Sequence, residues 1–291
     1  MITSSRIGRY GNTCNAMFQL AALIGMSKKT GLDYCVPYHE TYYEPNYGCT
    51  NNSIWDGFDL SYDERRVKYP DNCMIKSCNY PDNCMITPTE PDTKFKEVEF
   101  PFEYKDILVD DFTDMVGFFQ SEKYFEGAEQ EIKDQFKIKE VHKQVVDAKI
   151  KSGEYPDPLH STSLHIRLGD YTIKRNYHPE IPVRYWAQAM ASIPRRDNVV
   201  IFSDDVEQAR SMFGNDSRLT YSTEENPFPA LYHMSLCRNH IICNSTFGWW
   251  GAKLGEWNNP VDKVVVAPKI WFGKAHEFSS EDIIPNRWIK L

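Results

Sequence analysis

The residues best suited to chemistry lie at 165–171, which read His-Ile-Arg-Leu-Gly-Asp-Tyr and end a predicted strand at Ser163–Arg167. In open α/β sheets, ligands bind beyond the carboxyl ends of the strands. Arg167 carries a planar fork of N–H donors that suits a phosphate. Asp170 could orient that fork or accept a hydroxyl. The segment therefore indicates either an anion site or an ion pair that only shapes a turn.

A pair of acids follows a second predicted strand, in the sequence Phe-Ser-Asp-Asp at 202–205. Asp204 and Asp205 could hold a metal ion for a nucleotide diphosphate. They could also accept hydrogen bonds from the N–H groups of guanine. A third interpretation is structural, because Ser203 or Asp204 would be a good N-cap for the helix predicted at Val206–Phe213.

A third segment, Asn-Ser-Thr-Phe-Gly-Trp-Trp-Gly-Ala at 244–252, opens a predicted helix at Phe247–Trp257. Backbone N–H groups and the positive end of the dipole at a helix start form an anion site. Ser245 and Thr246 stand at that start. The alternative is an ordinary N-cap followed by two tryptophans in the core.

The first residues contain a glycine-rich loop, Gly-Arg-Tyr-Gly-Asn at 8–12, before a helix predicted to reach Lys29. Such a loop can face a cleft or hold a phosphate, and Gly11 and Asn12 are its candidate ligand residues. The pattern is short and has little specificity alone. Walker A, GxGxxG, HExxH and nucleophile-elbow motifs are absent from the sequence.

Composition indicates a globular protein. Of the 291 residues, 41% are apolar and 25% are charged, and the formal net charge is -8. The acidic balance argues against a protein that coats nucleic acid. The sequence shows no signal peptide and no apolar run of membrane-spanning length, which predicts a cytoplasmic chain. The eight cysteines form no CxxC pair, so we expect buried thiols rather than a zinc site.

Strands and helices alternate along both halves of the chain, which predicts parallel sheets with covered faces. The Pro- and Gly-containing segment 151–161 is the best linker. We therefore expect an α/β protein with two Rossmann-type domains, 1–155 and 156–291, facing a cleft.

Residues 38–100 are rich in Tyr, Asn, Pro and Asp, and within 69–86 a seven-residue sequence recurs with a period of 11. We interpret this duplication as a surface loop or hairpin.

Five segments together, and in this order, resemble family-11 glycosyltransferases, the α-1,2-fucosyltransferases. Gly8–Ala22 is similar to the family's opening GxGNQMFQxA-like loop and helix, with extra residues at 13–16. The others are 117–125 (Gly-Phe-Phe-Gln-Ser-Glu-Lys-Tyr-Phe), 165–171, 202–205 and 244–254. The resemblance spans about 10–254 and is weakest across 38–100.

The resemblance implies a GT-B-like fold in which the C-terminal domain holds GDP-fucose and the N-terminal domain is the acceptor side. It also implies a reaction that inverts the anomeric centre without a metal or other cofactor. Arg167 would hold the diphosphate, and Asp204 or Asp205 would read guanine. Neighbouring donor-binding residues would be His165, Asn244, Ser245 and Thr246.

Leu168 departs from the family, which usually has a second Arg at this position, and this puts the donor's affinity or the identity of its sugar in question.

The acceptor hydroxyl would need a general base, for which Asp170, His178 and Glu180 are all candidates. Aromatic side chains of the first half could stack on the acceptor glycan: Tyr42, Tyr43, Tyr47 and Trp55. The alternatives are a related enzyme that uses another nucleotide deoxysugar, or a catalytically silent carbohydrate-binding protein on this fold.

Overall fold

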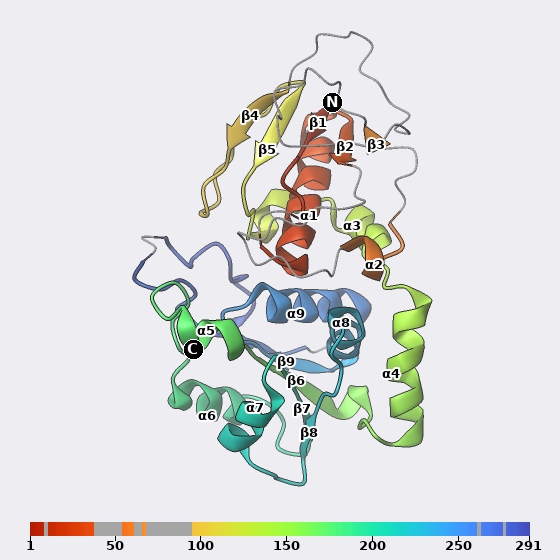
Figure 1. Cartoon of the computed structure of the whole chain (residues 1–291), viewed down its shortest axis with the longest axis vertical. Coiled ribbons are helices and arrows are strands. Elements are labelled where there is room, and N and C mark those ends of the chain that lie inside the picture. Colours follow the sequence, from red (N-terminus) through yellow and green to blue (C-terminus); the bar gives the residue numbers. More distant parts are fainter. Residues whose placement is uncertain (9–10, 38–53, 61–65, 68–94, 261–262, 276–277) are drawn as a thin grey trace. The chain divides into compact units, whose positions relative to one another are not determined.

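The computed structural model describes residues 1–8, 11–37, 54–60, 66–67, 95–260, 263–275 and 278–291. They form two compact units, Met1–Lys137 and Ile138–Leu291, and each is described by itself (Figure 1). Tyr42, Tyr43, Tyr47 and the 69–86 duplication lie outside the described residues. No described helix is both long and apolar enough to cross a bilayer.

The structure divides the chain between Lys137 and Ile138, whereas the sequence suggested 155/156. The reason is helix α4 (Glu140–Ser152), which packs on α8 (Pro227–Leu236) of the second unit. Tyr232 donates a hydrogen bond of 3.1 Å to Asp147. These contacts make the helix before the predicted linker part of the second unit.

Within the described residues, the first unit contains a five-stranded parallel sheet of order β3-β2-β1-β5-β4. Helix α1 packs against it (Figure 1). The elements are β1 (Ile2–Thr3), α1 (Thr13–Thr30), β2 (Tyr34–Pro37), α2 (Ile54–Gly57), β3 (Arg66–Val67), β4 (Lys96–Glu99), β5 (Thr113–Val116), the 3-10 helix η2 (Glu122–Phe125) and α3 (Glu129–Gln135).

The predicted end of α1 is confirmed. Gly31 caps the helix in the left-handed region, with φ of 72°, and its N–H bonds to the carbonyl of Ser27. A left-handed cap of this kind favours glycine. The apolar triplet Ile107–Val109 forms no strand: Leu108 is 79% exposed, and after β4 the chain returns to the sheet only at β5. A single apolar triplet was too short to decide between strand and loop.

The second unit contains, among its described residues, a six-stranded parallel sheet of order β11-β10-β9-β6-β7-β8. Its remaining elements, in chain order, are the 3-10 helix η3 (Pro158–His160), β6 (Ser161–Ile166), α5 (Gly169–Ile173), α6 (Val183–Ala191), β7 (Asn198–Ser203), α7 (Val206–Phe213), β8 (Leu219–Tyr221), β9 (Asn239–Ile241), α9 (Thr246–Asn258), β10 (Val265–Ala267) and β11 (Ile289–Lys290).

Alternate residues of the central strands serve the two faces of this sheet, as period-2 geometry requires. On one face Val199 and Ile201 pack with Trp186 of α6 and Ala209 of α7. On the other face Val200 and Phe202 pack with residues of α8. Figure 1 shows the same arrangement, with α6 and α7 on one side and α8 and α9 on the other. The core therefore fixes the carboxyl ends of the strands, where the candidate site begins.

Candidate active site

The strand order places the candidate residues at a topological switch point. From β6 the chain proceeds to β7 and β8 on one side, and β9 then pairs with β6 on the other side. Such a reversal opens a crevice outside the carboxyl ends of the two strands, where ligands bind in open α/β sheets. Arg167 follows β6, and Asn244 and Ser245 follow β9. The two segments thus meet at one edge, and the N–H of Cys243 bonds to the carbonyl of His165 at 3.1 Å.

Arg167 is held by two carboxylates. Its Nε donates to Asp170 at 2.9 Å and lies 3.2 Å from Asp204. Burial favours the neutral form, but the attraction of Asp204 and Asp170 outweighs it, so the pKa of Arg167 is raised above its ordinary value. Among the described residues neither Nη atom has an acidic partner or a hydrogen bond, and 29% of the side chain is exposed. The charged fork is fixed at its base and open at its tip.

Asp204 also binds the backbone behind the arginine. Its two oxygens accept the N–H groups of Leu168, at 2.8 Å, and Gly169, at 3.0 Å. A Cβ atom at Gly169 would lie 2.5 Å from Asp204 Oδ2, so only glycine permits this approach. Asp205 has the capping role instead, because its Oδ1 accepts the N–H of Gln208 in the first turn of α7. The sequence had proposed Ser203 or Asp204 as that cap, one or two residues too early.

Tyr171 joins the two sides of the switch point. Its hydroxyl donates to the carbonyl of Asn244 at 3.0 Å, and its ring stacks on His178 with centroids 4.0 Å apart. Burial raises the pKa of Tyr171 above its ordinary value, so the hydroxyl stays a neutral donor. The amide of Asn244 donates to the carbonyls of Pro179 and Trp271. Asn244 is 1% exposed, and it holds neighbouring loops in place.

Helix α9 begins at the same edge. Ser245 is its N-cap and accepts the N–H of Phe247, and Thr246 is the first helical residue. Gly248 brings this helix against β6, since a Cβ there would lie 2.8 Å from Nδ1 of His165. His165 is buried, and burial followed by the nearby Arg167 lowers its pKa to about 3. The neutral imidazole therefore supports the α9 start from within the core.

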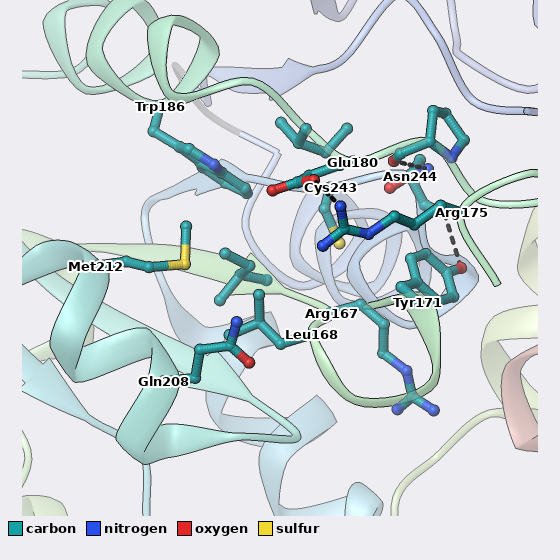
Figure 2. A pocket seen from close by; sticks show the side chains of 13 residues that line it. Arg167, Leu168, Tyr171, Arg175, Glu180, Trp186, Gln208, Met212, Cys243 and Asn244 are labelled. Carbon is teal, nitrogen blue, oxygen red and sulfur yellow. Dashed lines mark hydrogen bonds and ion pairs between the residues drawn. The ribbon is translucent and has the colours of Figure 1, made fainter. Parts of the chain in front are cut away.

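A pocket lies beside Arg167, with an empty volume, including its open mouth, of about 520 Å3. Its apolar wall includes Leu168, Trp186 and Met212, and Arg175 and Glu180 stand on the polar side, 3.3 Å apart. Figure 2 shows the guanidinium of Arg167 directed away from Trp186 and Met212. Leu168 is 8% exposed and belongs to the α6-side core. At this position an apolar side chain packs where the family usually has a cation.

The three candidate bases differ in their surroundings. Asp170 is 41% exposed and paired with Arg167. Glu180 is 71% exposed, and it lines the pocket with its partner Arg175. His178 is fixed by its stacking on Tyr171. All three lie within the segment that connects β6 to α6, so the structure gathers them near Arg167 and leaves the identity of the base a prediction.

In the first unit, Gly8, Gly11 and Asn12 of the predicted glycine-rich loop follow β1. The strand order of this sheet reverses between β1 and β5, so β1 ends at a switch point as β6 does in the second unit. Gly11 has a φ of 79°, and Asn12 is the N-cap of α1 without a side-chain cap bond. Gln19 fixes the loop: its Oε1 accepts the N–H of Gly8, and its Nε2 donates to the carbonyl of Gly117. The first and second resembling segments therefore meet at one sheet edge.

Asp114 of β5 is a residue that the sequence analysis missed. It is fully buried, and it accepts the N–H of Ser5 at 2.8 Å and the hydroxyl of Ser5 at 2.6 Å. Burial raises the pKa of Asp114, against the effect of these hydrogen bonds. The signal in the sequence was weak, because Ser5, two residues after β1, meets Asp114 only through the pairing of β1 with β5.

Comparison with known sequences decides the family. Residues 91–291 match the sequence profile described as Glycosyl transferase family 11. The chain belongs to this family. Family 11 membership confirms the resemblance seen in the five ordered segments, four of which lie within the matched range.

Two relatives from Escherichia coli are similar over part of their length. The O-antigen biosynthesis glycosyltransferase WbnK is 34% identical over 140 residues, which are 45% of this chain and 44% of the relative. An alpha-1,2-colitosyltransferase is 28% identical over 191 residues, or 61% of this chain and 62% of the relative. This family 11 chain thus aligns with about half of the length of these relatives.

The apo form of POFUT1 has a similar fold, with a TM-score of 0.50 at 11% identity, over 91% of this chain and 97% of that one. The α/β class and the GT-B-like, Rossmann-type organisation are therefore confirmed.

Among the described residues no group of three or more His, Cys, Asp or Glu side chains could hold a metal ion. Of the eight cysteines, the four described ones, Cys14, Cys35, Cys237 and Cys243, are buried thiols, as expected.

Proposed function

We propose that this chain is an inverting glycosyltransferase that moves fucose from GDP-fucose to a hydroxyl of an acceptor glycan, forming an α-1,2 linkage without a metal. The observation that carries the proposal is Arg167, fixed at Nε by Asp170 and Asp204 with its Nη atoms open, beside the start of α9. A preorganised cation and helix N–H groups are suited to a diphosphate.

In the proposed reaction the bond between the sugar's anomeric carbon and the β-phosphate oxygen breaks, and negative charge grows on the departing diphosphate. Arg167 and the N–H groups near Ser245 and Thr246 would stabilise that charge, because preorganised donors lower the barrier where charge develops. The acceptor oxygen would attack the opposite face of the sugar and invert it. Its proton would pass to Asp170, His178 or Glu180.

A thermal-shift titration of the purified chain with GDP, UDP and dTDP tests the donor. A nucleotide that binds only the folded state raises its stability by about 2.7 kcal/mol at a hundredfold excess over Kd. We expect this rise with GDP, and expect it to be lost in Arg167→Ala. Equal shifts with all three nucleotides would contradict guanine recognition. Donor hydrolysis or transfer with GDP-fucose then separates an enzyme from a silent binding protein.

A second candidate donor is a nucleotide-linked dideoxysugar. Two observations favour it: Leu168 gives the pocket an apolar wall, and one relative is described as an alpha-1,2-colitosyltransferase. Parallel transfer assays with GDP-fucose and GDP-colitose distinguish the two. A higher kcat/KM for colitose would replace fucose in the proposal and leave the roles of Arg167 and α9 unchanged.

A further inference from the structure

Two loops of the second unit present apolar side chains to solvent. Ile173, the last residue of α5, is 85% exposed, Tyr177 is 50% exposed, and Ile270, after β10, is 64% exposed. Residues 173–177 and 269–275 together are called the paired-loop surface. Figure 1 shows the loop after α5 and the blue loop after β10 on the same side of this unit.

The backbone of the paired-loop surface is well fixed. Gly273 donates its N–H to the carbonyl of Tyr177 at 2.8 Å, and Ala275 donates to Asn176 at 2.9 Å. A Cβ atom at Gly273 would lie 2.3 Å from the Asn176 carbonyl oxygen, so the two loops are in close contact. Trp271, within the second loop, is buried, and its carbonyl accepts a hydrogen bond from the amide of Asn244. The exposed apolar groups therefore project from a built surface.

The charge of this surface is opposite to that of the chain. Residues 173–177 and 269–275 carry four basic side chains and no acidic one, whereas the whole chain has a net charge of -8. The four are Lys174, Arg175, Lys269 and Lys274, and all four residues are exposed. Apolar side chains among cations, on one surface of an acidic protein, complement an anionic lipid interface, where apolar groups enter the headgroup region and cations meet the phosphates.

We propose that the paired-loop surface docks onto an anionic lipid bilayer. Ile173, Tyr177 and Ile270 enter the headgroup region, and the lysines at 174, 269 and 274 contact lipid phosphates. Arg175 is excluded from this role because it pairs with Glu180 in the pocket wall. The surface begins at the end of α5, whose first turn follows Arg167, so docking would bring the proposed donor site close to the bilayer.

Co-sedimentation of the full chain with vesicles tests the proposal. We expect binding to phosphatidylcholine vesicles that contain phosphatidylglycerol, weakened by added salt, and little binding to phosphatidylcholine alone. Each lysine near an anionic surface contributes a factor of about five, so Lys174→Ala with Lys274→Ala should lower the partition coefficient more than about tenfold. Ile173→Ser with Ile270→Ser should also weaken binding, by removing the apolar part.

The matched control is Lys151→Ala with Arg196→Ala, which removes two exposed cations elsewhere on the unit and should leave vesicle binding unchanged. Equal binding to both kinds of vesicle, no binding to either, or an equal loss in the control would overturn the proposal. Binding to heparin that matches vesicle binding, with no effect of the isoleucine substitutions, would assign a general polyanion site instead. All variants should keep the GDP-induced thermal shift of the parent chain, because they lie outside the proposed donor site.

Discussion

Asp204 Oδ2 lies 3.2 Å from Nε of Arg167, while the same carboxylate accepts the backbone N–H groups of Leu168 and Gly169. One acidic side chain thus fixes both the guanidinium and the turn that carries it. The acid comes from the end of β7 and the arginine from the end of β6, two strands that pair along their full length. The position of the cation therefore depends on the register of the sheet.

Replacing Arg167 by Ala should lower kcat by about 10²–10³ at saturating donor, because one preorganised donor to the developing charge is lost. The fold should persist, because the side chain lies at the strand end and is 29% exposed. Steady-state transfer assays measure the first effect, and thermal unfolding measures the second. Arg196→Ala, at an exposed site on the same unit, is the matched control and should have parental kinetics. Near-normal turnover in Arg167→Ala would remove Arg167 from the mechanism.

Two variants, Asp204→Asn and Asp205→Asn, distinguish the positioning of Arg167 from the recognition of guanine. Asp204→Asn places an amide N–H₂ against donor groups, so it should lower the free energy of unfolding by about 1–2 kcal/mol and reduce transfer. Asn is as good an N-cap as Asp, so Asp205→Asn should change stability by less than about 0.5 kcal/mol. Urea unfolding and GDP titration measure both effects. A large loss of GDP affinity in Asp205→Asn at unchanged stability would assign guanine recognition to Asp205.

The sequence predicted the second unit better than the first. Strand β7 contains a continuous apolar run, Val199–Phe202, and β6, β7 and α9 lie within about two residues of their predicted positions. The convergence of Arg167 and the α9 start follows from parallel strands that end at one edge. In the first unit the strands β1 and β3 have two residues each, which is too short for a periodic pattern.

What the sequence could not supply was the partner of each polar group. Asp204 and Asp205 are adjacent and chemically identical, yet one binds the backbone of another strand's turn and the other caps its own helix. Local propensity assigns the cap to within a residue or two, but only the β6–β7 register shows which acid reaches Arg167. The same holds for the short helix α5, which has only five residues. The N–H of its first residue, Gly169, is bound by Asp204, which lies 35 positions away in the chain.

Gly248→Ala should destabilise the second unit. The added Cβ would lie 2.8 Å from His165 Nδ1 and 3.1 Å from Ile242 Cβ, both in the rigid core, which we expect to cost about 1–3 kcal/mol. Gly251→Ala is the matched control in the same helix. Its Cβ would lie 2.5 Å from the terminal methyl, 3.0 Å from Sδ and 3.1 Å from Cβ of Met234. The thioether end of this side chain can rotate away, whereas the His165 ring cannot, so the loss should be smaller. Urea unfolding of both variants measures the difference, and an equal or larger loss at Gly251 would contradict this account of α9 packing.

The buried His233 should make stability depend on pH. Its ring packs between Tyr155 and Phe202, and within the described part of the chain neither ring nitrogen has a hydrogen-bond partner. Burial, aided by Lys149, lowers the pKa of His233 from 6.5 to about 4. Between these two pKa values the unfolded chain binds a proton that the folded chain does not. The free energy of unfolding therefore rises with pH across this window, and the protein becomes less stable as the pH falls through it.

His233→Phe keeps an apolar ring in this site and removes the titrating group. The slope of unfolding free energy against pH should fall by up to about 1.4 kcal/mol per pH unit between pH 4 and 6.5, leaving the contributions of other buried histidines such as His165. At neutral pH the variant should be at least as stable as the parent, because two unpaired buried nitrogens are gone. Urea unfolding at a series of pH values measures both effects. A parental slope in His233→Phe would show that His233 does not titrate as a buried neutral group.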